Sequence, residues 1–192
     1  MKTSHLLCLS TLVLSMGCTT VSTMSKPGFE MGRCKKIAVA RFGHPTMPYR
    51  GADGGEIMAL GLVKRGYSVL DSSSLAPVID QDDLYESGLT PEIKGKLKSL
   101  GVDALVMGTV VDAGCSMAGG GAAALAPFRK SRCRSTVLVK MLEPATGELL
   151  WGATATETGE AVGMNEDMAL LKTMESIDAV IPEICREPQC GS

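Results

Sequence analysis

Residues 135–159 read STVLVKMLEPATGELLWGATATETG, and this stretch predicts a β-hairpin. Its first part, 135–142, places valine and methionine at alternate positions, which is the period of two that a half-buried strand requires. The sequence Pro-Ala-Thr-Gly at 144–147 supplies turn residues, and 148–158 returns as a second strand. Two neighbouring strands joined by a tight turn predict the antiparallel part of a sheet.

Outward from this hairpin the chain alternates between short apolar strands and amphipathic helices. We expect strands at 36–42, 67–71 and 102–111, helices around 57–63, 74–79 and 90–100, and a last helix from Asn165 to Ile184. The expected N-caps of the last three helices are Ser74, Thr90 (with Pro91 in the first helical position) and Asn165. The order is therefore β-α-β-α-α-β-β-β-α. Early crossover units favour parallel pairing and the late hairpin adds antiparallel strands. The predicted fold is α/β, a mixed sheet of about five strands with helices packed on it.

Composition excludes two broad classes of protein. The chain has 192 residues, 45% of them apolar and 21% charged, with a net charge of −2. A nucleic-acid-binding protein usually carries a basic stripe or arm, whereas the 19 basic residues here are scattered. Disorder along the whole chain is excluded by the apolar content and the small net charge. One domain of ordinary size remains.

The amino terminus has the pattern of a bacterial signal peptide. Lys2 supplies the positive start, and an apolar run extends from Leu6 to Met16. Eleven residues at about 1.5 Å each cannot cross a hydrocarbon core of about 30 Å, so this run is too short to span a membrane. We therefore expect residues 1–17 to be removed by cleavage.

The cleavage site indicates a lipid anchor. Ser15-Met16-Gly17-Cys18 resembles the lipobox of bacterial lipoproteins, although Ser15 stands where that motif usually has leucine. In lipoproteins the cysteine carries a diacylglycerol and an acylated amine, which together anchor a chain firmly. The alternative is ordinary secretory cleavage with Cys18 an incidental thiol. Thr19, in place of the aspartate that retains lipoproteins at the inner membrane of enteric bacteria, points to the outer membrane and its periplasmic face.

The polarity of the remaining segments predicts where the tether, the domain and the tail begin and end. Residues 18–35 are polar, contain glycine and lack a period, so we expect the lipidated cysteine and a tether there. The α/β domain is expected to occupy 36–187, and 188–192 to form a tail.

Cysteine usage agrees with export to an oxidising compartment. Five cysteines remain after Cys8 is removed and Cys18 is lipidated, which allows two disulfides and one free thiol in fifteen patterns. Local spacing favours Cys115 with Cys133 and Cys185 with Cys190. Reduced, buried thiols are the alternative.

Three segments together resemble a known family of bacterial envelope domains. They are GYSVLDSSSL (66–75), LKSLGVDALVMGTVV (97–111) and the hairpin 135–159, in which Thr146, Gly147, Glu148 and Trp151 match the family pattern. They are similar to the periplasmic domain shared by the curli secretion lipoprotein CsgG, the penicillin-binding-protein activator LpoB and many other bacterial lipoproteins. The resemblance covers roughly residues 36–160. It implies a CsgG/LpoB-like α/β domain and says little about which partner is bound.

The sequence departs from the family pattern in two segments, and these differences limit which functions of the family we expect. A secretion channel of the curli type inserts two membrane hairpins per subunit, which requires roughly 40 residues. The only candidate segment here, 112–134, is a Gly/Ala-rich loop that is too short for two hairpins and leaves room for at most one. The long proline-rich tether typical of LpoB is also missing.

No motif marks a catalytic centre. The glycines at 119–121 lack the spacing of a phosphate-binding loop, and His44 has no cysteine or histidine partner at metal-ligand spacing. The acidic group of 80–86 lacks the ligand rhythm of a calcium loop and is better interpreted as a solvated helix face. We therefore expect no catalytic residues, no metal and no cofactor.

Two features are candidate partner surfaces. Trp151, on a strand after a tight turn, either fills the core or presents its indole to a partner. Arg129 and Lys130, in a basic group beside the apolar loop, can meet anionic lipid or a protein, and a plain solvated loop is the alternative.

The sequence thus supports two hypotheses of function. The first is a non-enzymatic, lipid-anchored envelope protein that binds a periplasmic or outer-membrane protein partner. The second is a subunit of an oligomeric outer-membrane secretion or assembly complex similar to the curli channel, which would make the chain a homo-oligomer.

Overall fold

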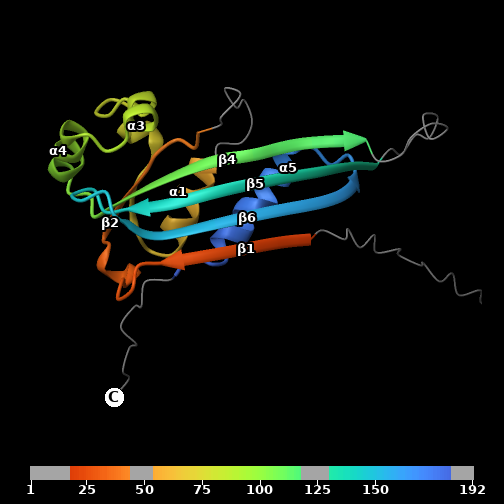
Figure 1. The fold of residues 1–192 in the computed structure, drawn as a ribbon, viewed down its shortest axis with the longest axis horizontal. Coiled ribbons are helices and arrows are strands. Elements are labelled where there is room, and N and C mark those ends of the chain that lie inside the picture. Colours follow the sequence, from red (N-terminus) through yellow and green to blue (C-terminus); the bar gives the residue numbers. More distant parts are fainter. Residues whose placement is uncertain (1–17, 44–53, 118–129, 183–192) are drawn as a thin grey trace, which may run out of the picture.

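The computed structural model describes residues 18–43, 54–117 and 130–182. These residues form one mixed six-stranded sheet with the strand order β1-β6-β5-β4-β2-β3 (Figure 1). The strands are β1 (Cys18–Ser25), β2 (Lys36–Val39), β3 (Ser68–Leu70), β4 (Ala104–Met117), β5 (Lys130–Leu142) and β6 (Leu149–Val162). The helices are α1 (Gly54–Lys64), α2 (Ser72–Leu75), α3 (Gln81–Ser87), α4 (Pro91–Ser99) and α5 (Glu166–Asp178), with a 3-10 turn at Met31–Arg33.

The predicted α/β class and mixed pairing are confirmed. Strand β2 pairs in parallel with β3 and β4, because α1 and the α2–α4 segment carry the chain back between them. Strands β4, β5 and β6 pair antiparallel, and the predicted 144–147 turn joins β5 to β6. Gly147 in that turn has φ +83°, a conformation that glycine adopts without a Cβ clash.

Predicted helix caps are present in the structure. The Asn165 side chain accepts a hydrogen bond from the Met168 N–H at the start of α5. Thr90 accepts from the Ile93 N–H, and Pro91 occupies the first turn of α4. Helix α2 begins earlier than predicted, because Asp71 rather than Ser74 caps it.

The sheet has one more strand than predicted, and that strand is β1. We expected 18–35 to be a tether, but residues 18–25 pair antiparallel with β6 in continuous register from Cys18–Thr158 to Ser25–Trp151. The sequence of β1 is mostly polar and has no apolar face. An edge strand can be this polar because it pairs with the sheet through its backbone and leaves most of its side chains exposed. The pattern of apolar residues therefore could not reveal it.

The predicted 112–134 loop is also partly strand. Strand β4 continues to Met117 and β5 begins at Lys130, so 112–117 and 130–134 extend the ladder. Small and polar residues occupy this extension, so it lacks the alternation of apolar and polar residues by which a strand is predicted. The acidic segment 80–86 forms the N-cap, Asp80, and most of helix α3.

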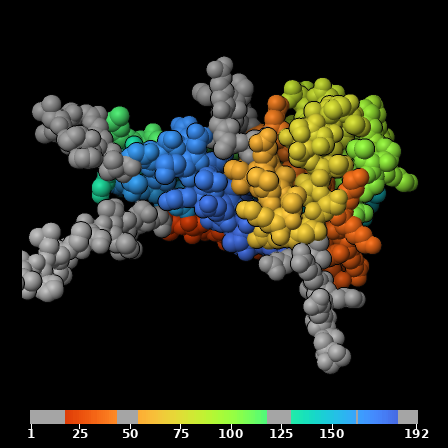
Figure 2. Space-filling model, turned by 180° about the vertical axis from the view of Figure 1, so that it is seen from behind, coloured from red at the N-terminus to blue at the C-terminus, as the bar shows by residue number. Residues whose placement is uncertain are grey.

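Helices cover the two faces of the sheet unequally. Helices α1 and α5 lie side by side on one face of the sheet (Figure 2). The larger core forms beneath them, around Ile37, Val139, Trp151 and Leu170. Helices α2–α4 pack on the opposite face only over β2 and the start of β4, around Ala38, Leu97 and Leu105. The rest of that opposite face, over β1, β6 and β5, is called here the open face; no helix among the described residues covers it.

Candidate functional site

The candidate site is a crevice at the carboxyl end of β2, called here the Arg41 crevice. In α/β sheets, ligands bind beyond the carboxyl ends of parallel strands, where neighbouring connections leave on opposite faces. This condition is met at β2, since α1 follows it on one face and α2–α4 lie on the other. The crevice has a volume of about 360 Å³ and is lined by Arg41, Ser72, Ser73, Ala76, Ile79, Asp80, Gln81 and Asp82.

Phe42 fixes the backbone beside Arg41. Its ring is buried and fills the space that a side chain at Gly108 would need, and it also lies against Gly54 at the start of α1. The Gly43 N–H donates to the Gly108 carbonyl at 2.9 Å, which continues the pairing with β4 past the end of β2. Arg41 is therefore the exposed residue that follows the buried strand.

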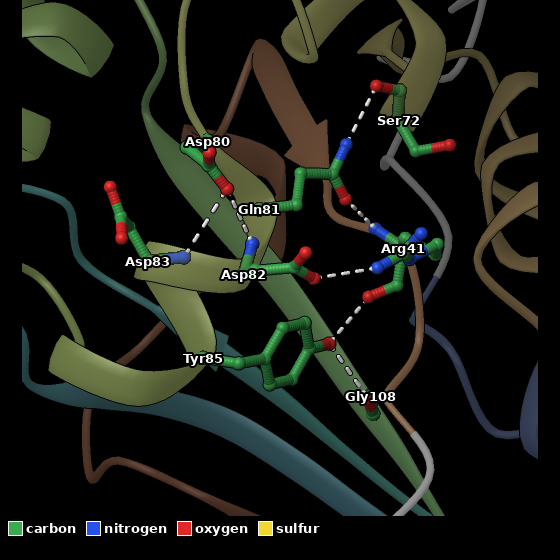
Figure 3. Close-up of polar contacts among 8 residues, drawn as sticks. All are labelled: Arg41, Ser72, Asp80, Gln81, Asp82, Asp83, Tyr85 and Gly108. Atoms are coloured by element: carbon green, nitrogen blue, oxygen red, sulfur yellow. Dashed lines mark hydrogen bonds and ion pairs between the residues drawn. The ribbon is translucent and has the colours of Figure 1, made fainter. Parts of the chain in front are cut away.

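Polar contacts join Arg41 to helices α2 and α3 (Figure 3). The Arg41 N–H donates to Gln81 Oε1 at 2.6 Å, and Gln81 Nε2 donates to the Ser72 carbonyl at 2.8 Å. The Tyr85 hydroxyl lies 2.6 Å from the Arg41 carbonyl oxygen and 2.8 Å from that of Gly108. Together these bonds hold α2 and α3 against the end of β2.

The charged groups of the crevice are exposed. Arg41 Nη2 lies 2.8 Å from Asp82 Oδ1, with the two side chains 58% and 79% exposed. A pair this exposed adds little to stability, so its carboxylate and guanidinium can exchange partners at low cost. Asp80 is occupied in capping α3 through the Asp82 and Asp83 N–H groups.

The neighbouring cap residue is an ionised carboxylate. Hydrogen bonds, first from the Ser74 hydroxyl and then from the Ser74 N–H, lower the pKa of the Asp71 carboxyl below its ordinary value. The Ser73 hydroxyl donates to the same carboxylate at 3.0 Å. The crevice thus offers a guanidinium, carboxylates and hydroxyls, which suit recognition of polar or charged groups. Among the described residues that line it, none is a histidine, and none is a cysteine whose thiol could act as a nucleophile.

Metal binding finds no support in the part of the chain that is described. Within 18–43, 54–117 and 130–182, no three histidine, cysteine, aspartate or glutamate side chains gather as a ligand set.

No helix of these described ranges is long and apolar enough to cross a bilayer.

The sequence-predicted site residues lie apart from this crevice. Cys18 is exposed and is the first residue of β1. Trp151 is 3% exposed and packs in the core, so its indole is not presented to a partner. Lys130 is exposed at the start of β5. Arg129, Cys185 and Cys190 lie outside the described residues.

Cys115 and Cys133 form a disulfide in the structure. They lie directly opposite each other on β4 and β5. The bond therefore joins these two strands where they extend beyond the helices α2–α4.

Sequence reasoning missed Arg41 because the apolar pattern places it as the penultimate residue of a buried strand. The available signal was its position: a charged residue at the carboxyl end of an apolar parallel strand is a candidate by the carboxyl-end rule. The acidic residues of α3 were interpreted separately as a solvated face, since their distance from Arg41 in the chain conceals the contact.

Solved structures with a similar fold are known. The most informative are two PelC dodecamers from Paraburkholderia phytofirmans. A single-residue variant of PelC has a TM-score of 0.56 and 17% identity over 83% of this chain and 95% of that chain. The other PelC dodecamer has a TM-score of 0.53 and 16% identity over 83% and 94%. The chain shares the fold of PelC, and this likeness establishes the fold and not the activity.

Two further structures are less similar. Lipoprotein GNA1162 from Neisseria meningitidis has a TM-score of 0.47 and 17% identity over 75% of this chain and 94% of that chain. The LpoB C-terminal domain from Salmonella enterica has a TM-score of 0.37 and 10% identity over 64% and 81%. Neither sequence comparison, with protein-family models or with curated proteins, finds a match.

Proposed function

We propose that this chain is a non-enzymatic lipoprotein of the bacterial outer membrane, held by lipid on Cys18 and facing the periplasm, that binds an envelope protein partner. The observation that carries the anchor is the position of Cys18. It follows the apolar run 6–16 of a signal peptide after a single glycine, and it is an exposed thiol that begins the first strand. The fold shared with PelC is compatible with this assignment.

The partner site that we propose is the Arg41 crevice. Its exposed guanidinium and carboxylate suit a charged side chain or chain terminus of a protein. Its described lining residues include no histidine that could pair with a nucleophile as in a hydrolase. Helix α3, which lines the crevice, lies toward the opposite end of the sheet from the start of β1 (Figure 1). A partner in the crevice therefore does not compete with the anchor on Cys18.

The first experiment tests the anchor. Cys18→Ser in the full chain is expected to move the protein from the membrane fraction to the soluble periplasmic fraction. A variant that stays membrane-bound would rule out the lipoprotein assignment.

The second experiment tests the crevice by photo-crosslinking in cells. A photoreactive amino acid at the exposed Ser73 is expected to capture one envelope protein, and the same probe at exposed Lys98 in α4 serves as the control. Loss of the adduct in Arg41→Glu would show that the guanidinium recognises the partner. Equal adducts at both positions would refute the crevice as the site.

Two observations favour the second candidate, a homo-oligomeric assembly. Among the described strands, β1 lies at the edge of the sheet and leaves a row of backbone groups open to pairing, and the PelC structure of the same fold is a dodecamer. The particle size of the detergent-extracted protein separates the two: a ring of many subunits supports an assembly, whereas a monomer excludes it.

A further inference from the structure

The anchor residue and the sheet are directly connected. Cys18 is both the cysteine for lipid attachment in the proposed function and the first residue of β1, so no flexible segment separates the lipid from the sheet. The orientation of the domain on the membrane is therefore restricted by the sheet itself. The inference below rests on the proposed lipidation of Cys18.

Strand register places the Cys18 side chain on the open face. The Thr19 hydroxyl donates to the Glu157 carboxylate, which is 3% exposed on the helix-covered face. Side chains alternate along a strand, so Cys18 and Thr20 point to the opposite, open face. A lipid on the Cys18 sulfur consequently leaves the sheet on that face.

The neighbouring strands extend beyond the anchor. Cys18 pairs with Thr158, and β6 continues four residues further to Val162, which pairs with Lys130 of β5. Four residues span about 13 Å. The polar headgroup layer is only about 5–8 Å deep on each side of a bilayer. A sheet standing upright on the membrane would push these strand ends into hydrocarbon, so the sheet must lean.

Charge indicates the face on which it leans. On the open face of this end, the side chains of Lys130, Arg132 and Arg134 are exposed in a row along β5. Glu160 is the ion-pair partner of Arg132, and Asp112 is that of Arg134. The opposite face of the same end carries helix α5, whose first turn contains Glu166 and Asp167. An anionic surface attracts the first face and repels the second.

We infer that the end of the open face around Cys18, Lys130, Arg132 and Arg134 is the surface that contacts the membrane, with its basic side chains among anionic lipid headgroups. The sheet lies tilted, with the α2–α4 layer as a spacer at the other end, because those helices project from the same face. Contact with the membrane explains why no described helix covers the open face at the end of the sheet nearest Cys18.

Lysine acylation tests this orientation on the full-length protein. The lipidated chain is added to vesicles of phosphatidylethanolamine and phosphatidylglycerol and treated with a membrane-impermeant acylating reagent; modification is read peptide by peptide by mass spectrometry. The Arg132→Lys/Arg134→Lys variant keeps both charges and adds two reporters beside Lys130. Lys64 of α1 and Lys172 of α5 are the controls on the opposite face, and Cys18→Ser in buffer gives the reference rates.

Lys130 and the two introduced lysines are expected to react about fivefold more slowly on vesicles than in buffer, with Lys64 and Lys172 unchanged. Equal or greater protection of Lys64 and Lys172 would overturn the inference. So would slow reaction of the three lysines already in Cys18→Ser, since another copy would then cover the face. The mass of the amino-terminal peptide separates the two proposals: lipid on Cys18 without protection refutes only the orientation, and an unmodified Cys18 refutes both.

Discussion

Cys34 shows how one residue acquires its chemistry from burial. Its thiol is 4% exposed beside a hollow of about 300 Å³ lined also by Lys26, Arg33, Asp103 and Glu143. Burial first, and then the charges of Asp103 and Glu143, raise the pKa of the Cys34 thiol to about 11. The thiolate is the reactive form, so this cysteine is inert at neutral pH although the hollow is open to solvent.

We predict that iodoacetamide at pH 8 modifies Cys34 about a hundredfold more slowly in the folded protein than after unfolding in urea. Peptide mass spectrometry measures both rates, and the exposed Cys18 of a non-lipidated preparation is the internal control. The raised pKa also stabilises the fold below about pH 9, and this contribution is lost as the pH rises through 11. Equal labelling in both states would contradict the buried position.

Gly108 is the second residue whose role depends on a contact. A Cβ at this position would overlap the ring of Phe42. This ring lies against β4 and fixes the backbone next to Arg41. We predict that Gly108→Ala lowers the free energy of unfolding by about 1–3 kcal/mol, because the ring must move. Urea denaturation measures it.

Gly114 on the same strand provides the matched control, since a Cβ there meets nothing within 4 Å. Gly114→Ala is expected to leave stability within about 0.5 kcal/mol of the parent. A similar loss in both variants would mean that strand propensity, rather than Phe42, sets the cost.

At the scale of elements, Arg65 joins the two helices on the covered face. Its guanidinium, 15% exposed, bonds to the carboxylate and the backbone carbonyl of Asp178 at the end of α5, and to the Ile181 carbonyl at 3.3 Å. Gly61 in α1 allows this approach, because a Cβ there would collide with the Asp178 carboxylate. One arginine thus satisfies carbonyl groups at the end of α5.

We predict that Arg65→Ala destabilises the protein by about 1.5–3 kcal/mol, because several charge-assisted hydrogen bonds are lost together. The adjacent Lys64 is exposed, and Lys64→Ala is expected to change stability by less than about 0.5 kcal/mol. Thermal unfolding followed by circular dichroism compares the two. Equal effects would show that helix propensity, and not the Asp178 contact, is responsible.

At the scale of the whole molecule, the Cys115–Cys133 disulfide limits the freedom of the unfolded chain. It closes a segment with a sequence separation of 18 and links strands that are already paired. We predict that Cys115→Ala/Cys133→Ala lowers the free energy of unfolding by about 2–4 kcal/mol, mainly through the unfolded ensemble. The parent protein under reducing conditions should unfold at the same urea concentration as the double variant. If the two differ, another cysteine pair contributes.

Local pattern determined much of this protein. The alternation in 135–142, the turn at 144–147 and the caps Thr90 and Asn165 predicted the hairpin and two helices correctly, because these depend on residues close together in the chain. The signal for lipid attachment at Cys18 is likewise local and remains a prediction of the sequence.

Tertiary structure alone decided the rest. Strand β1 exists because β6 offers it an unpaired edge, and the Arg41 crevice exists because helices α2 and α3 pack against the end of β2. The burial of Trp151 and the extension of β4 and β5 past 112 and 134 are also settled by neighbours from distant segments. Side-chain periodicity records only which face of a segment is buried, and backbone pairing at an edge leaves no such record.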